Sequence, residues 1–170
     1  DGNREIIIGA SNGKAIRFRE DDVRDMGRTA AGVRGIHLND DEFVVGVSPV
    51  TDEQTQILAI TQNGYGKRTE VDEYRLQTRG GKGVKTLNVT EKNGPLVKLI
   101  SVNGDEDLLV VYDKGIIIRT PIDQISITKR ATQGVKIINL VDNHLVKTIA
   151  LVDKEECDEL EETTDETAKT

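Results

Sequence analysis

The chain has 170 residues and a mass of 18.7 kDa; 36% of the residues are hydrophobic, 31% are charged and only 3% are aromatic, and the formal net charge is -7. This length and composition predict one soluble domain with a modest aliphatic core. No segment approaches the roughly 18 consecutive apolar residues of a transmembrane helix, and we expect no secretion signal, since no charged segment precedes an apolar one. Because the single Cys157 cannot form an internal disulfide, we expect a reducing, cytoplasmic setting.

The negative charge is concentrated at the C-terminus. Residues 153–170 contain nine acidic residues against two lysines, which accounts for the whole net charge of -7 and leaves residues 1–152 neutral overall. Few apolar residues and many like charges predict a disordered acidic tail over 153–170. The net charge of -7 therefore does not argue against basic patches within residues 1–152.

An internal repeat organises residues 1–152. Three units, at about 1–51, 52–102 and 103–152, align at an offset of 51 residues. Each unit has a Gly-Val-basic triplet at the same place, beginning at Gly32, Gly83 and Gly134. Such tandem copies indicate a fold built from one supersecondary unit. The other aligned columns are Gly13/Gly64/Gly115, Arg17/Arg68/Arg119 and Arg28/Arg79/Arg130.

Each unit has the pattern of short strands separated by turns. In the first unit, strands are expected over 5–10, 15–19, 33–38 and 43–50, with a tight Asn12-Gly13 turn between the first two. Residues 20–27 fit either a helical turn or an extended crossover. We predict an all-β fold of three four-stranded antiparallel blades, similar to a propeller or pinwheel. Closed propellers use about 4 to 8 blades, so three blades predict part of a larger disc.

No catalytic or metal-binding constellation is evident. His37 and His144 occupy non-equivalent positions in different repeats, without a metal-ligand spacing, and Cys157 lies among carboxylates that disfavour a thiolate. The acidic clusters 40–42 and 105–107 lack the pattern of a calcium loop. We therefore expect a binding module and no enzyme in this chain, with no metal site.

Basic residues recur at fixed positions of the repeat and form the candidate binding site. For the column that begins at Arg17, structural salt bridges and anion binding are both open. For the other two columns, next to glycine-containing loops, we favour binding of a polyanion. Scarce aromatics favour contacts to phosphates over base readout. The expected DNA-binding residues are Arg28, Arg34, Arg68, Arg79, Lys82, Lys85, Arg130 and Lys136.

Four strings resemble a known family: TQNGYGKRT (61–69), MGRTAAGVRGI (26–36), VTEKNG (89–94) and RATQGVKII (130–138). They are similar to the C-terminal domain of the bacterial DNA gyrase A protein, here its last three blades plus an acidic tail. The resemblance implies a six-bladed β-pinwheel that exchanges strands between blades and bends DNA around a basic rim. It also implies a box-like loop, with Thr78 where a second base is usual: Gln77, Thr78, Arg79, Gly80, Gly81, Lys82 and Gly83.

The resemblance further implies the role of the whole enzyme. Wrapping of double-stranded DNA, without sequence preference, lets an ATP-dependent type II topoisomerase introduce negative supercoils. Its ATP and Mg act elsewhere in the parent enzyme, so no cofactor is expected here. The implied partners are DNA, the rest of the gyrase A protein, and the gyrase B protein in an A2B2 holoenzyme, with no membrane. We expect the tail to compete with DNA.

Three alternatives stay open. The chain could be the corresponding C-terminal domain of topoisomerase IV, or a protein-interaction propeller whose basic residues are structural. Half-discs of three blades could also self-associate into a ring of six.

Overall fold

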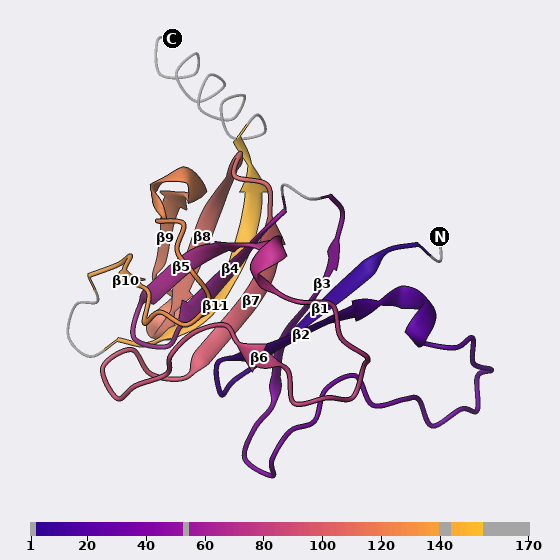
Figure 1. Cartoon of the computed structure of the whole chain (residues 1–170). Coiled ribbons are helices and arrows are strands. Elements are labelled where there is room, and N and C mark those ends of the chain that lie inside the picture. Colours follow the sequence, from indigo (N-terminus) through magenta and orange to yellow (C-terminus); the bar gives the residue numbers. More distant parts are fainter. Residues whose placement is uncertain (1–2, 53–54, 140–143, 155–170) are drawn as a thin grey trace, which may run out of the picture.

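The computed structural model describes residues 3–52, 55–139 and 144–154 (Figure 1). The predicted acidic tail lies outside the described residues from residue 155 onward. Its first residue, Asp153, ends the last strand.

The described elements are strands and short 3-10 turns, which confirms the all-β class. None of the helices in this part of the chain is long and apolar enough to cross a bilayer. The strands of the first repeat are β1 (Glu5–Ala10), β2 (Lys14–Arg19) and β3 (Val44–Val50). Those of the second are β4 (Gln56–Thr61), β5 (Tyr65–Glu70), β6 (Val84–Lys85) and β7 (Leu96–Val102). Those of the third are β8 (Glu106–Tyr112), β9 (Ile117–Pro121), β10 (Val135–Lys136) and β11 (Val146–Asp153).

The three sheets repeat, but each short strand pairs with the preceding repeat. The first sheet has the order β3-β1-β2-β6 and the second β10-β5-β4-β7, so β6 and β10 are contributed by the next repeat along the chain. In the described residues the third sheet has three strands, in the order β11-β8-β9. Neighbouring blades are thus joined covalently and by hydrogen bonds. All of the ladders between these strands are antiparallel.

This strand exchange corrects one expected strand. Residues 33–38 were expected to pair within their own unit, yet they form no strand in the structure. The equivalent residues in the later repeats form β6 and β10, which need the outer strand of the preceding blade as a partner. Backbone groups form a ladder only beside a partner strand, and a four-strand count per unit does not reveal which unit supplies that partner.

The turns follow the expected chemistry. Gly13 and Gly64 have positive φ values of 80° and 79° in the first two hairpins, as the tight turns require. In the third hairpin Lys114 adopts a φ of 64° beside Gly115. The segment that sequence left undecided begins with a 3-10 turn in each repeat: η1 (Glu20–Asp22), η2 (Val71–Glu73) and η4 (Ile122–Gln124), with η3 (Asp113–Gly115) in the third hairpin.

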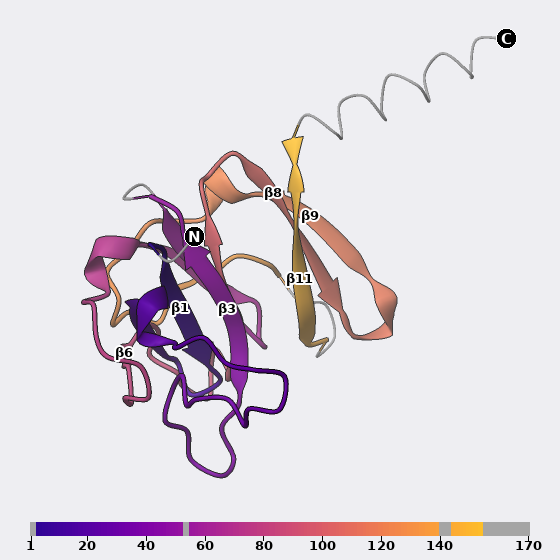
Figure 2. The ribbon, with the colours of Figure 1, turned by 90° about the vertical axis from the view of Figure 1, so that its right-hand side faces the viewer.

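The hydrophobic core lies between the blades. Ile57 and Ala59 of β4 pack toward the first blade, whereas Leu58 and Ile60 pack toward the third. Both faces of β4 are covered, which explains its continuous apolar sequence. Figure 2 shows β11, β8 and β9 as a separate layer beside β1 and β3. A third cluster covers the far face of the first blade and includes Ile8, Ala10, Ile16, Phe18 and Ile36.

Candidate nucleic-acid interface

The exchanged strands form the outer edge of the first two blades. The blades contact each other along β3, β7 and β11, and β6 and β10 lie at the opposite edges of their sheets. Residues 77–85 and 128–136 lead to this edge, and residues 26–35 are their equivalent in the first repeat; we call these three segments the rim loops. They contain all the predicted DNA-binding residues except Arg68, and the second and third loops end in β6 and β10.

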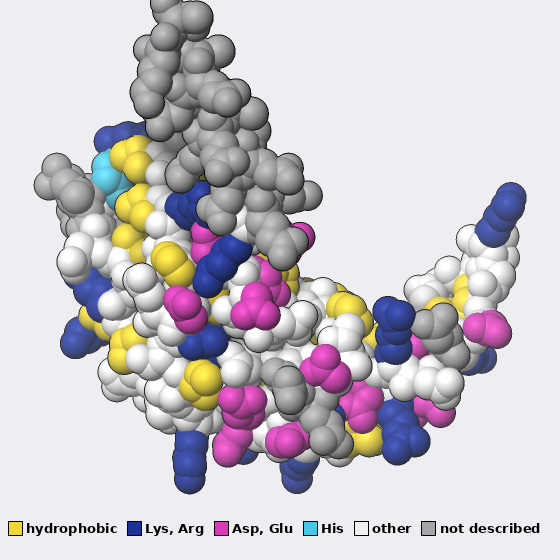
Figure 3. All heavy atoms as spheres, turned by 90° about the horizontal axis from the view of Figure 1, so that it is seen from above, with side chains coloured by type: hydrophobic (Ala, Val, Ile, Leu, Met, Phe, Trp, Pro, Cys, Tyr) yellow, Lys and Arg dark blue, Asp and Glu magenta, His cyan; other side chains and the backbone are white. Residues whose placement is uncertain are grey.

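Five of the predicted basic residues are exposed: Arg28, Arg34, Lys82, Lys85 and Lys136. Three of these, Arg34, Lys85 and Lys136, share one repeat position and therefore recur once per repeat. On the face seen from above, basic and acidic side chains are intermingled (Figure 3).

Arg79 and Arg130 are half-buried and brace the preceding repeat. The Arg79 Nε donates to the Asp22 carbonyl at 2.9 Å and its guanidinium also donates to the Arg34 carbonyl at 3.1 Å. Arg130 donates to the Lys85 carbonyl at 2.9 Å, in the equivalent place. These arginines connect the rim loops of successive blades, so part of each guanidinium has a structural task.

Arg68 is interior and connects the second and third repeats. It is 7% exposed. Its guanidinium donates to the Ile125 carbonyl at 2.8 Å, the Asp123 carbonyl at 3.1 Å and the Gln56 side chain at 2.9 Å. We therefore leave Arg68 out of the candidate interface, because these bonds and its burial keep its guanidinium away from a bound duplex.

Arg17 makes an equivalent contact with the next repeat, which we call a staple, whereas the described bond of Arg119 lies within its own repeat. Arg17 bonds to the Glu5 carboxylate at 2.5 Å and donates to the Val71 carbonyl at 2.9 Å in the next repeat. Arg119 bonds to Asp107, also at 2.5 Å. An acid or amide stands twelve residues before each arginine, a spacing set by the β1-β2 type hairpin. For the column Arg17/Arg68/Arg119, these contacts support a structural role over anion binding.

The glycine of the box-like loop serves chain packing. A Cβ on Gly83 would lie 2.5 Å from the Ala15 carbonyl oxygen, and its φ is +71°. A side chain is excluded because β6 approaches β2 closely there. The sequence favoured binding of a polyanion next to this glycine-containing loop; at Gly83 the close neighbour is the preceding blade.

Sequence reasoning missed three lysines at this edge. Lys14 of β2 is the register partner of Lys85 in the strand-exchanged ladder. Lys92 lies 5.8 Å from the centroid of the Tyr65 ring, which is within cation–π range. Lys129 is exposed in the third rim loop. Only Lys129 had a sequence signal, since it adjoins the predicted Arg130.

His144 has an ordinary carboxylate partner. His144 Nδ1 lies 2.8 Å from Asp113 Oδ1. Desolvation raises the pKa of Asp113, but hydrogen bonds from His144 and the Leu145 amide outweigh it and bring the pKa below its usual value. In the described part of the chain, no group of three or more His, Cys, Asp or Glu residues could hold a metal ion.

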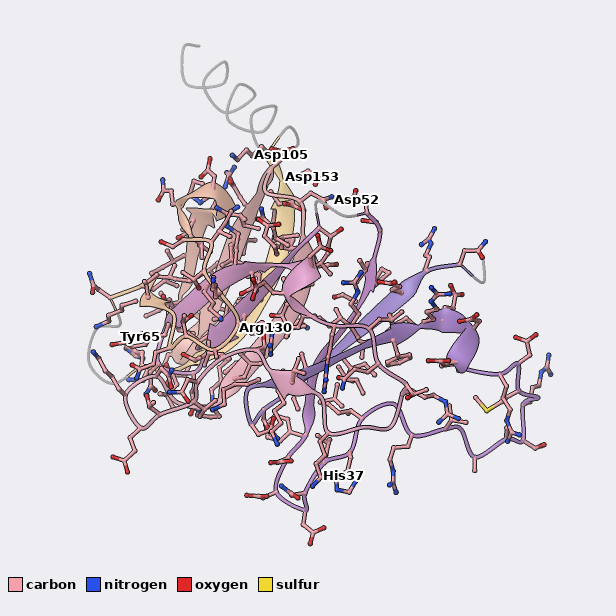
Figure 4. All side chains as sticks on the ribbon, viewed as in Figure 1. His37, Asp52, Tyr65, Asp105, Arg130 and Asp153 are labelled. Carbon is pink, nitrogen blue, oxygen red and sulfur yellow. The ribbon has the colours of Figure 1, made fainter. Side chains whose placement is uncertain are left out.

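Figure 4 shows Asp52, Asp105 and Asp153 near one end of the blades, whereas Arg130, Tyr65 and His37 lie toward the other. The labelled acids are thus separated from the third rim loop. A polyanion seated at the rim loops would avoid these carboxylates.

The strand-exchanged blades and the recurring bases at their outer edges define a propeller-like all-β protein with basic rim positions. The chain belongs to the family described as the DNA gyrase C-terminal domain, beta-propeller, which it matches over residues 4–51, 55–103 and 106–153. It is 48% identical to the DNA gyrase A protein of Staphylococcus epidermidis over 91% of this chain and 46% identical to that of Staphylococcus aureus over 95%. The chain spans 18% of the length of these relatives.

Two solved structures are similar in fold. A DNA gyrase A C-terminal domain superposes with a TM-score of 0.79 at 26% identity, covering 88% of this chain and 50% of that one. The C-terminal domain of a DNA topoisomerase IV gives a TM-score of 0.86 at 24% identity, covering all of this chain and 53% of that one. Topoisomerase IV thus shares the fold, while the matches at 47% and 48% identity are gyrase A proteins.

Proposed function

We propose that the chain is a double-stranded DNA-binding module of a gyrase A protein and that it bends the duplex around its rim loops. The observation that carries the proposal is the recurrence of exposed bases at one repeat position, Arg34, Lys85 and Lys136, of which Lys85 and Lys136 lie in the outer-edge strands β6 and β10. Each repeat thus offers a cationic group at the same position, as a phosphate backbone passing from blade to blade would need.

Such a site recognises charge and DNA shape. Phosphate contacts supply affinity without sequence information, and the scarcity of aromatic residues leaves little for base stacking. Bending a few tens of base pairs costs about 1 to 10 kcal/mol. Many weak contacts along the rim must offset that cost, so no single base should dominate binding.

In this proposal, DNA bending by the chain serves the reaction of the larger gyrase assembly. In the proposal, DNA is wrapped in a positive sense and presented for ATP-driven strand passage, which introduces negative supercoils in the cytoplasm. ATP and Mg act in the rest of the gyrase A protein and in the gyrase B protein of an A2B2 enzyme, and this chain contributes no catalytic residue. Relaxing closed circular DNA in its presence should then shift the linking number upward, and an unchanged linking number would argue against wrapping.

The first experiment is a salt titration. The triple variant Lys82→Gln, Lys85→Gln and Lys136→Gln should bind a short duplex more weakly and lower the slope of log K against log salt by about 0.9 per lost phosphate contact. Lys147→Gln is the matched control, since Lys147 is exposed on β11, away from the outer edge. Affinity that ignores salt in the unmodified chain would contradict the proposal.

A protein-interaction propeller is the second candidate. This candidate is favoured by the hydrogen bonds that Arg79 and Arg130 donate to carbonyls of the preceding repeat. In that case, the triple lysine variant and Arg79→Ala with Lys82→Ala would both leave DNA binding unchanged. The same titration therefore separates the two candidates.

The acidic tail enters the proposal as a competitor of DNA for the rim bases. Truncation after Lys154 keeps β11 complete. It also removes the whole net charge of -7, because the charges of Asp153 and Lys154, which remain, cancel. Truncation should raise DNA affinity at low salt and have little effect at high salt, because the competition is electrostatic. Unchanged affinity at low salt would remove the tail from the proposal.

Self-association of half-discs is supported by the edge of the third sheet. In the described residues β9 is an edge strand, and Ile116, Ile117 and Ile118 are 47%, 60% and 37% exposed. In the other blades this edge is occupied by the next repeat, so the occupant we propose is segment 33–38 of a second copy. Ile117→Lys should then abolish a concentration-dependent dimer in sedimentation; a monomer at high concentration would exclude it.

A further inference from the structure

Lys67 is a buried lysine at the junction of the second and third repeats. It is 0% exposed, in β5, at the position that isoleucine holds in the other repeats, at Ile16 and Ile118. Removing an ammonium group from water is costly unless hydrogen bonds compensate. Burial, and then the charge of Arg130, lower the pKa of Lys67 to about 8. A charge placed at such a cost calls for a function that isoleucine cannot supply.

The ammonium contacts the backbone of the third rim loop. Lys67 Nζ donates to the Lys129 carbonyl at 2.7 Å and also to the Arg130 carbonyl. Two successive carbonyls that converge on one buried point repel each other unless a donor stands between them. With both carbonyls directed inward, Lys129 is exposed and Arg130 reaches the Lys85 carbonyl at 2.9 Å.

The second rim loop is fastened differently. There the guanidinium of Arg79 donates to two carbonyls, and the Gly80 amide donates to the Gly35 carbonyl at 2.5 Å. In the third loop Arg130 Nε is buried without a hydrogen-bond partner in the described structure. Arg130 thus has fewer guanidinium bonds than Arg79, and the Lys67 ammonium fastens its backbone instead.

We propose that Lys67 is a positioning residue of the DNA interface, which fixes the Lys129 and Arg130 carbonyls so that both basic side chains are presented at the rim. Lys67 itself does not touch DNA, because it is fully buried. The inference rests on the proposed function for its consequence, but the ordering of the loop can be measured without DNA.

The DNA measurement compares Lys67→Met with the unmodified chain. Methionine fills a similar volume without the charge, so the slope of log K against log salt should fall by about 1 to 2, as if one or two phosphate contacts were lost. Ile16→Met, at the same position of the first repeat, should leave the slope unchanged. In a Lys129→Ala, Arg130→Ala background, Lys67→Met should have no further effect on DNA binding.

The second measurement is limited proteolysis by trypsin, which cleaves after lysine and arginine. Lys67→Met should speed cleavage after Lys129 and Arg130 several-fold and leave cleavage after Lys82 unchanged. If the unmodified chain does not bind DNA but this acceleration occurs, the positioning role stands and the proposed function fails. Should Lys67→Met not fold, Lys67→Ile, which places the residue of the other two repeats at this position, takes its place. Unchanged cleavage after Lys129 and Arg130 in a folded variant would overturn the inference.

Discussion

Lys14 and Lys85 lie opposite each other in the antiparallel ladder that joins the first two repeats. Like charges directly opposite across two strands are unfavourable, and here they are set at the outer edge of a blade. The Lys85 ammonium reaches Asn88 Oδ1 at 3.4 Å, which does not neutralise it. An anion bound at the rim would relieve the repulsion, so this pair links stability to the proposed ligand.

The first prediction separates stability from binding at this pair. Lys85→Gln should raise the free energy of unfolding slightly, by about 0.2 to 0.5 kcal/mol at low salt, because the like-charge pair is removed. It should weaken DNA binding at the same time. Urea unfolding at low and high salt measures the first effect, and the gain should disappear at high salt. A loss of stability at low salt would contradict the account of the pair.

The second prediction tests strand exchange through two glycines. Gly83→Ala should destabilise the chain strongly, because the new Cβ would lie 2.5 Å from the Ala15 carbonyl oxygen. Gly32→Ala is the matched control: Gly32 also has a positive φ, of +81°, but among the described residues, apart from Gly32 and its two chain neighbours, no atom lies within 4 Å of the added Cβ. The control should cost about 1 to 2 kcal/mol and Gly83→Ala clearly more, in urea unfolding.

Equal costs for the two alanine variants would mean that β6 does not approach β2 so closely in solution. Hydrogen exchange of the Thr86 and Leu87 amides, which both donate to the Gly13 carbonyl, gives an independent measure. These amides should lose protection in Gly83→Ala and keep it in Gly32→Ala.

The repeat made much of the fold predictable. The offset of 51 residues, the Asn-Gly turns and the apolar strands indicated blades, and the strands 5–10, 15–19 and 43–50 lie within a residue of β1, β2 and β3. The partner of Val84–Lys85 was not predictable from residue pattern alone. A two-residue strand carries no periodicity, and pairing with Lys14 spans two repeats.

The candidate site was only partly predictable for a physical reason. An arginine can recur in every repeat because it binds a ligand at the surface or because it bonds to carbonyls of the next repeat. The sequence alone does not distinguish these two roles. Arg68 and Arg34 are both basic and recurrent, yet Arg68 is buried among backbone oxygens and Arg34 is exposed. Lys67 gave no sequence signal at all, because its column contains isoleucine in the other two repeats.

The third prediction concerns the staple between repeats. Arg68→Ala would leave the Ile125 and Asp123 carbonyls without the guanidinium that bonds them. An acceptor left buried without a donor costs about 1 to 3 kcal/mol. Ile125 is buried and Asp123 is exposed, so we expect a loss of about 1 to 3 kcal/mol in the free energy of unfolding, mainly from the Ile125 carbonyl. Arg119→Ala is the control, since the Arg119 side chain is 37% exposed and should cost less. Equal losses would show that the staple does not join the repeats.

The last prediction follows from the charge of Lys67. Its pKa is lowered from 10.5 to about 8 in the folded chain. Between these two values the unfolded chain binds one proton more than the folded chain at this site, so the free energy of unfolding should rise with pH in that window. Below about pH 8 the ammonium is charged in both states, and its contribution no longer changes with pH.

Urea unfolding of the unmodified chain and of Lys67→Met, from about pH 7.5 to 10, measures this effect. Burial raises the pKa of Tyr74 to about 12, but Tyr74 is present in both proteins, so its contribution cancels in the difference between them. The difference in free energy of unfolding between the two proteins should shift in favour of the unmodified chain as pH rises from 8. Parallel pH profiles would mean that Lys67 keeps an ordinary pKa, and the desolvation that we assign to this site would then be wrong.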